Sequence, residues 1–254
     1  MSAGTVRRET RDGVTTLTLD RPERRNALSA EMIEALSVAI DEAAADPACR
    51  CLVLTGAGGN FCAGRELAPG MDRSLEPVLA YDDAYIGIFH ALGELPKPSV
   101  AVVQGYAVAG GFTLAMGCDF VIADAGARFG AMEMKNGFPA AVNTALLSHL
   151  VGRRHALELL LFGEPVPAET LNRMGLITRL AADAEDLCRV TGEFTAALAA
   201  LDPMAVRLTK ETHYALATMP LDQALNQARN LNALLMASGR IEEGAKAFAA
   251  RRKG

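Results

Sequence analysis

The apolar positions of this chain repeat first with the period of a strand and then with that of a helix. Residues 14–19 alternate threonine with valine or leucine, which is the pattern of a half-buried strand. Residues 5–9 form an expected partner strand across a hairpin turn at residues 12–13, an Asp-Gly pair. Short apolar runs bounded by turn residues predict buried strands at 51–54, 99–103 and 120–122.

Helical spacing separates these strands. The apolar residues Met32, Leu36, Ile40 and Ala43 recur at three- and four-residue steps after Ser29, whose hydroxyl can cap the first turn. Further helices are predicted over residues 81–92, 112–116, 139–150, 157–162 and 168–174, with one more short strand at 176–177. Strands that alternate with helices in this way predict an α/β fold.

Two other parts of the chain have a different character. Residues 68–79 contain two prolines and a glycine without a clear period, and we expect a mobile loop there. From residue 187 onward the pattern is helical, with predicted helices at 187–200, 203–217, 221–237 and 240–252. We therefore expect two domains: a core of residues 1–195 and a helical C-terminal segment of residues 196–254.

Composition limits the class of protein. The 254 residues are 50% hydrophobic and 22% charged, as in a soluble globular protein, and the net charge of −5 argues against a nucleic-acid binder. The chain has no apolar run of the roughly 18 residues that span a membrane, and its start has no apolar signal core. We expect a cytoplasmic protein, with its five cysteines reduced.

Two glycines mark a place where backbone N–H groups can meet a ligand. Gly110 and Gly111 follow a strand and open the predicted helix at 112–116. The first N–H groups of a helix have no internal partner, and an anionic oxygen can approach them where no side chain intervenes. A second glycine-containing turn, residues 61–67, follows another apolar strand. One N–H from each turn would form an oxyanion hole.

These segments carry a family resemblance. The stretches R21-P-E-R-R-N-A-L28, F61-C-A-G-R-E-L67, G105-Y-A-V-A-G-G-F-T-L-A115 and F129-G-A-M-E133, in this order and spacing, resemble the crotonase family of enoyl-CoA hydratases and isomerases. The resemblance implies an α/β fold made of a right-handed spiral of ββα turns. It also implies a helical C-terminal segment that covers an active site and makes trimer contacts. The expected assembly is thus a homotrimer or a dimer of trimers.

The resemblance assigns both oxyanion-hole donors. They are the backbone N–H groups of Arg65 and Gly110, and neither role depends on the side chain. The side chain of Arg65 either lies in solvent or reaches a phosphate. The surrounding loop residues are expected to line the substrate site: Ala63, Gly64, Glu66 and Leu67. The family's usual aspartate of this loop is replaced here by Glu66.

The acid–base residues distinguish between two reactions. Hydratases of the family use two glutamates, and this chain has Thr113 at the position of the first and Glu133 at the position of the second. A threonine hydroxyl can hold water but cannot act as a base near neutral pH. Apolar neighbours, among them Phe138, would raise the carboxyl pKa of Glu133 toward the working pH. Both Thr113 and Phe138 are expected at the substrate.

One glutamate favours an isomerase. Moving a double bond needs a single group that removes a proton and returns it elsewhere, whereas hydration divides its work between two carboxylates. An enoyl-CoA hydratase remains the alternative, and a non-catalytic or RNA-binding relative is a further one, which the acidic balance disfavours. Residues 134–145 hold no carboxylate, which disfavours the dienoyl isomerases and the aroyl-CoA dehalogenases. The acyl group itself stays open.

Coenzyme A would enter as part of the acyl-CoA substrate, and we expect no separate cofactor. Arg24 and Arg25 lie in the segment that contacts the nucleotide in relatives and can bind its phosphates. Phe248 and Arg251 match aromatic and basic residues of the family's last helix, which reach a neighbouring subunit's nucleotide. An ordinary solvated helix end explains these two residues equally well. The histidines show no spacing typical of a metal site.

Overall fold

The computed structural model describes residues 4–66, 74–242, 244 and 246 of the chain. It divides into two compact units, Met1–Val206 and Arg207–Gly254. Residue 195, where the sequence placed the domain boundary, lies within a helix of the first unit. Of the predicted loop at 68–79, residues 68–73 lie outside the described part, and residues 75–79 are wrong because they belong to a helix that begins at Leu75. No helix among the described residues is long and apolar enough to cross a membrane.

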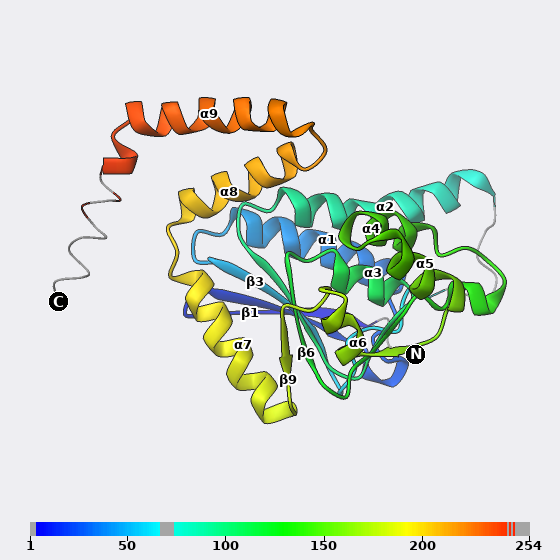
Figure 1. Cartoon of the computed structure of the whole chain (residues 1–254). Coiled ribbons are helices and arrows are strands. Elements are labelled where there is room, and N and C mark those ends of the chain that lie inside the picture. The colour runs from blue at the N-terminus through cyan, green and yellow to red at the C-terminus, as the bar shows by residue number, and fades with distance from the viewer. Residues whose placement is uncertain (1–3, 67–73, 243, 245, 247–254) are drawn as a thin grey trace. The chain divides into compact units, whose positions relative to one another are not determined.

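A mixed sheet forms the centre of the first unit (Figure 1). Its strand order is β1-β2-β3-β4-β6-β9, in which β1 and β2 are antiparallel and the later neighbours are parallel. The bounds are β1 Thr5–Arg11, β2 Val14–Asp20, β3 Cys51–Gly56, β4 Ser99–Val103, β6 Phe120–Asp124 and β9 Arg179–Ala181. A smaller sheet has the order β5-β7-β8, with β5 Tyr106–Val108, β7 Arg128–Gly130 and β8 Val166–Pro167. From β4 to β7 the chain alternates between the two sheets, β8 stays in the smaller one, and β9 returns to the larger.

Helices cover both faces of the larger sheet. The bounds are α1 Ala30–Ala45, α2 Leu75–Glu94, α3 Gly110–Met116, α4 Ala141–Leu150, α5 Arg153–Phe162, α6 Ala168–Arg173 and α7 Ala184–Ala199, with 3-10 turns η1 Pro22–Arg24 and η2 Met132–Asn136. Figure 1 shows α1 and α2 on one face and α7 on the other. In β3, Leu52 and Leu54 join the core under α1, while Cys51 and Val53 join the core under α7. Because such strands are buried on both faces of the sheet, their sequences are continuous apolar runs.

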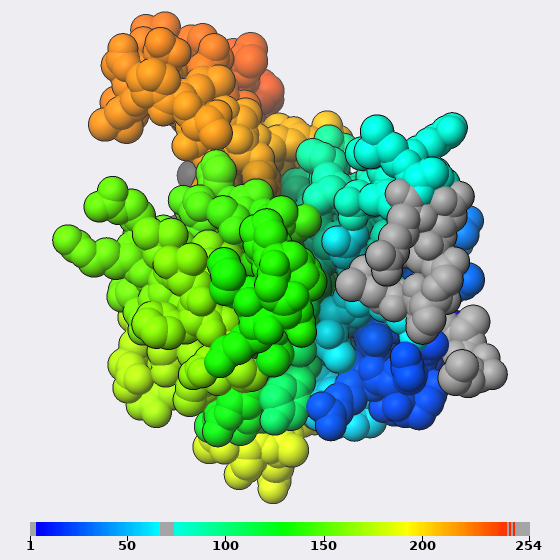
Figure 2. Space-filling view, turned by 90° about the vertical axis from the view of Figure 1, so that its right-hand side faces the viewer, coloured from blue at the N-terminus to red at the C-terminus, as the bar shows by residue number. Residues whose placement is uncertain are grey.

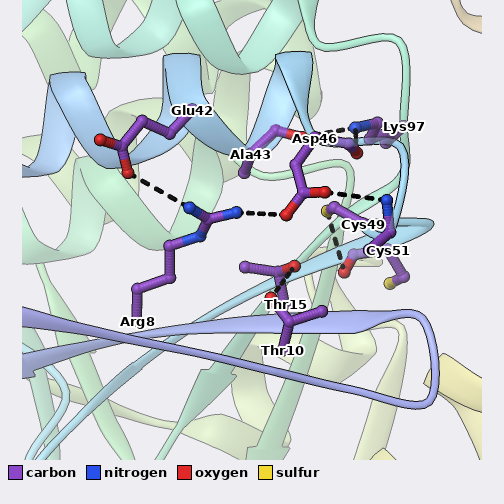
Figure 3. A network of polar contacts seen from close by, with 10 residues as sticks. Arg8, Thr10, Thr15, Glu42, Ala43, Asp46, Cys49, Cys51 and Lys97 are labelled. Atoms are coloured by element: carbon purple, nitrogen blue, oxygen red, sulfur yellow. Dashed lines mark hydrogen bonds and ion pairs between the residues drawn. The ribbon is translucent and has the colours of Figure 1, made fainter.

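The carboxyl end of α1 is tied to neighbouring elements by charge (Figure 3). Arg8 of β1 pairs with Glu42 at 3.2 Å and with Asp46 at 2.5 Å. Lys97 Nζ donates to the carbonyl oxygens of Ala43 and Asp46 at 2.5 and 2.6 Å. Carbonyl groups at a helix C-terminus lack partners and attract cations. Lys97 thereby fixes the start of β4 against the end of α1.

Several predicted boundaries are wrong, and the helices predicted at 157–162 and 187–200 begin earlier, at Arg153 and Ala184. The helix expected from residue 81 begins at Leu75, because Pro77 lies in the first turn, where a missing N–H breaks no hydrogen bond. The strand expected at 176–177 lies instead at Arg179–Ala181, where the chain pairs with β6. Leu176 and Ile177 are apolar because they enter the core before the strand begins.

The second unit consists of helices. It contains most of α8 (Pro203–Leu216) and all of α9 (Leu221–Ala237), which confirms two of the predicted helices. The helix expected at 240–252 falls mostly on residues outside the described part. No residue of α8 or α9 is buried, and α9 exposes the large apolar side chains Leu221, Leu225, Leu234 and Met236.

Candidate functional site

The turn before α3 approaches the loop after β3 very closely. A Cβ added to Gly111 would lie 2.1 Å from the carbonyl oxygen of Cys62, so only glycine fits there. Ala109, one residue before the helix, has a φ of 49° and a ψ of −125°. Its N–H donates to Gly130 of β7 at 2.8 Å. The smaller sheet thus holds this turn in a conformation that an alanine rarely adopts.

Two backbone N–H groups lie side by side at this contact. A Cβ on Gly64 would be 3.0 Å from the nitrogen of Gly110, and a Cβ on Gly110 would be 3.2 Å from the nitrogen of Arg65. Neither the Arg65 nor the Gly110 N–H donates to a partner among the described residues. Almost all buried N–H groups in proteins are paired, so two free ones in one place can receive an anionic oxygen.

Glu133 lies in η2 and is held by an asparagine. Asn143 of α4 donates from Nδ2 to Glu133 Oε1 at 3.2 Å and to the carbonyl oxygen of Ala109 at 3.1 Å. Glu133 Oε2 and Asn143 Oδ1 are both buried and find no hydrogen-bond partner in the described structure. One carboxylate oxygen is therefore fixed, while the other is available to a ligand. Phe138, with its side chain half exposed, closes the same turn through an N–H bond to the Glu133 carbonyl.

Thr113 and Tyr85 place two hydroxyl groups next to this turn. Thr113 is buried, and its hydroxyl donates to the carbonyl oxygen of Ala109 at 3.3 Å. Tyr85 of α2 is also buried and donates to the carbonyl oxygen of Gly110 at 2.5 Å. Burial raises the pKa of Tyr85, although a hydrogen bond with Thr113 acts in the opposite direction. Tyr85 stays protonated and can serve as a donor.

The side chain of Arg65 packs against α2. It forms an ion pair with Asp82 and lies over the rings of Tyr81 and Tyr85, with its Cζ atom 5.4 and 4.8 Å from their centroids. This contact anchors the loop whose N–H group faces Gly110. The side chain remains partly exposed, and its contact with a phosphate stays a prediction.

Glu66 connects the 61–66 loop to the first arginine-rich segment. Its carboxylate accepts from Arg21 at 2.6 Å and from Arg24 at 2.7 Å. The hydrogen bond from Arg21 is the main reason why the pKa of Glu66 is lowered. The longer glutamate, in place of the family's usual aspartate, thus reaches both arginines at once. Arg25 is exposed, with its guanidinium 5.6 Å from the ring of Tyr106.

Cys62 is the thiol closest to these groups. It is fully buried, and burial raises its pKa to about 12. The N–H of Gly64 donates to its sulfur at 3.4 Å. A thiol of this kind remains protonated near neutral pH and is no nucleophile there.

The structure brings most of the predicted site residues together from distant parts of the sequence. The loop Ala63–Glu66 pairs with residues 25–28 through hydrogen bonds of 2.8 to 2.9 Å. Figure 2 shows the green middle of the chain beside the cyan and blue N-terminal third on one face of the molecule. Leu67, Phe248 and Arg251 lie outside the described residues.

Three buried polar residues of this region were missed by the sequence analysis: Tyr85, Asn143 and Asn26. Asn26 holds the 56–60 turn by donating to the carbonyl oxygens of Ala57 and Asn60 at 2.9 and 2.7 Å. No local sequence pattern predicts the contacts that these three side chains make.

A family profile and two related proteins show which family the sequence resembles. The enoyl-CoA hydratase/isomerase family profile matches residues 9–254. A putative enoyl-CoA hydratase of Thermus thermophilus is 40% identical over 238 residues, which cover 91% of this chain and 92% of that protein. The 1,2-epoxyphenylacetyl-CoA isomerase of Escherichia coli is 35% identical over 248 residues, 94% of this chain and 93% of that protein.

The fold has close counterparts among solved structures. The structure of an enoyl-CoA hydratase from Mycobacterium smegmatis superposes with a TM-score of 0.90 at 31% identity, and covers 99% of this chain and 97% of that chain. The predicted α/β spiral with C-terminal helices is confirmed by this match.

Proposed function

The chain belongs to the enoyl-CoA hydratase/isomerase family, and from that premise we propose that it moves a double bond within an enoyl-CoA thioester, with Glu133 as its single base. The observation that carries the proposal is the pairing of two free backbone N–H groups, on Arg65 and Gly110, with the free oxygen Oε2 of Glu133. Thr113 occupies the place where a second carboxylate would be needed for hydration.

Each group has a role in this reaction. Glu133 Oε2 takes a proton from C2 of a 3-enoyl thioester, and the electron pair of that C–H bond moves into a dienolate. The negative charge gathers on the thioester oxygen, where the N–H groups of Arg65 and Gly110 stabilise it. The protonated Glu133 then gives its proton to C4. The C3–C4 double bond is lost and a C2–C3 double bond forms, so no atom is gained or lost.

Hydration of a 2-enoyl thioester is the second candidate. Glu133 Oε2 and Asn143 Oδ1 are two buried acceptors without partners, and a water molecule has two protons to offer them. Most of the similar proteins bear the name of hydratases, including that of Thermus thermophilus, whereas the Escherichia coli relative is an isomerase of a CoA thioester.

The nucleotide part of the substrate has cationic side chains available to it. We place its phosphates near Arg24 and Arg25, which are exposed on the segment that pairs with the 63–66 loop. Arg24 already shares the carboxylate of Glu66 with Arg21, so its guanidinium is held in position. Phe248 and Arg251 remain proposed contacts from a neighbouring subunit.

A substrate panel with one variant tests the proposal. Wild-type protein should convert 3-enoyl thioesters to 2-enoyl thioesters, and Glu133→Gln should lose about 10²–10⁴-fold in kcat, the usual contribution of a general base. Glu164→Gln is the control, because Glu164 is an exposed glutamate paired with Lys135. Rapid hydration of 2-enoyl thioesters without any isomerisation would establish the second candidate instead.

A further inference from the structure

Asn143 is joined to both halves of the proposed site. It lies in the first turn of α4 and is 1% exposed. We propose that Asn143 is a positioning residue, whose amide sets the Glu133 carboxylate at a fixed place relative to the turn that carries the Gly110 N–H group. This inference rests on the proposed function, since it assigns the base and the oxyanion hole to those groups.

The geometry of one amide group carries the inference. The two protons of Asn143 Nδ2 go to different segments: one to Glu133 Oε1 in η2 and one to the carbonyl oxygen of Ala109 before α3. Ala109 directly precedes Gly110, so the amide spans from the base to the residue adjoining the hole. A flipped amide would place Oδ1 against two other acceptors, which fixes its orientation on chemical grounds.

This arrangement leaves two buried oxygen atoms, Glu133 Oε2 and Asn143 Oδ1, without a hydrogen-bond partner in the described structure. Because Asn143 occupies Oε1, the other carboxylate oxygen of Glu133 is the one left to exchange a proton. Asn143 Oδ1 is itself buried without a partner. Buried polar atoms are almost always paired, so two unpaired acceptors around one carboxylate point to a donor that arrives with the substrate or as water.

A purely structural role makes a different prediction. If Asn143 only joined α4 to the 109–111 turn, Asn143→Leu would lower stability and leave the kcat of the folded protein unchanged. If it positions the base, Asn143→Leu lowers kcat in a protein that still folds. Asn143→Asp in turn puts a carboxylate where the amide now donates to Glu133 Oε1 at 3.2 Å. Two carboxylates at one site cannot both ionise easily, so the apparent pKa of the pair rises.

The test uses two substitutions at Asn143 and one matched control. Asn143→Asp keeps the size of the side chain, and Asn143→Leu removes its donors. Asn136→Asp introduces the same charge on an exposed residue of η2 that donates to the carbonyl oxygen of Met132. Tyr85 and the Lys135–Glu164 pair are the same in each variant. The readouts are kcat and KM against pH, and a carbon-13 titration of the Glu133 carboxyl identified by comparison with Glu133→Gln.

We expect the pH profile of kcat to move to higher pH by about one unit or more in Asn143→Asp, because two close carboxylates do not both ionise easily, while Asn136→Asp leaves the profile within a few tenths of a unit. Asn143→Leu should lower kcat by about tenfold or more, with KM changed less than about threefold, the pattern of a group that acts in the chemical step. Equal titrations in both aspartate variants, or full kcat in folded Asn143→Leu, would overturn the inference. Wild-type protein without any enoyl-CoA activity would refute the proposed function, whereas an active wild type with a fully active Asn143→Leu variant would refute only the role of Asn143.

Discussion

Thr113 is the residue that separates the two candidate reactions. Its position in α3 faces the turn of Ala109, and the hydratases of the family carry a glutamate there. Thr113→Glu should introduce measurable hydration of a short 2-enoyl thioester, because it supplies the second carboxylate. Thr113→Gln is the matched control, since it adds the same bulk without a base. A larger side chain in this buried site should cost about 1–3 kcal/mol of stability, so both variants need an unfolding curve. Equal hydration rates in the two variants would count against the role assigned to this position.

Cys62 makes stability depend on pH in the alkaline range. Burial raises its pKa from 9.0 to about 12, so the folded protein keeps a proton that the unfolded chain loses. The unfolded state is therefore favoured as pH rises from about 9 toward 12, and the free energy of unfolding should fall by about 1.4 kcal/mol per pH unit from this group.

Urea unfolding at about pH 8 and about pH 10 measures this effect. Folded Cys62→Ala should show a shallower loss of stability than wild-type protein, and Cys188→Ala, which removes an exposed thiol, should keep the wild-type loss. An identical slope in the Cys62→Ala variant would show that the thiol is not protected by burial.

At the scale of elements, local signals were sufficient for most of the larger sheet. The strands predicted at 51–54, 99–103 and 120–122 are confirmed as β3, β4 and β6. They could be predicted because a strand that is buried on both faces has a continuous apolar sequence. Helix α1 was predicted from its cap as well, and Ser29 accepts from the N–H of Met32 as expected. The edge strand β9 was misplaced because its Arg179 and Leu180 carry no such run.

The parts of the site that escaped prediction depend on contacts across the sequence. The backbone donors could be predicted, since glycine at a close approach is itself a sequence signal. Tyr85 acts 25 residues away on Gly110, and Asn143 acts 34 residues away on Ala109. A tyrosine or an asparagine in a helix has no spacing that would reveal such a partner. Only the packing of α2 and α4 against α3 reveals these roles.

Glu66, Arg21 and Arg24 form a cluster that joins two segments of the chain. Its contribution to the stability of the fold should depend on pH. Arg21 holds the pKa of Glu66 below its ordinary value of 4.5, so this link stabilises the folded state above that pH and is lost as pH falls through the lowered pKa. Glu66→Gln should therefore lower Tm at neutral pH, and its difference from wild type should shrink in acid. Glu164→Gln, which affects an exposed pair, should change Tm little. A Tm difference for Glu66→Gln that is constant with pH would contradict this reading of the cluster.

At the scale of the whole molecule, the second unit is incomplete by itself. Four large apolar side chains of α9, Leu221, Leu225, Leu234 and Met236, are each more than 60% exposed. Such a surface on a single short unit is typical of an interaction site. Together with the family's C-terminal segment, it supports our proposal that the protein assembles as a trimer or a dimer of trimers.

The assembly can be tested with one leucine of α9. Light scattering at micromolar concentration should give the mass of three or six chains, and Leu234→Asp, at a position 69% exposed, should reduce it, because a carboxylate would be buried without a partner in the interface. Gln227→Glu adds a similar charge at an exposed polar position of the same helix and should leave the mass unchanged. A monomeric wild-type protein would remove the proposed assembly altogether. An unaltered oligomer in Leu234→Asp would instead place the contact away from this part of α9. In that case the exposed leucines would need another partner, and the proposed contacts of Phe248 and Arg251 with a neighbouring subunit's nucleotide would lose their support.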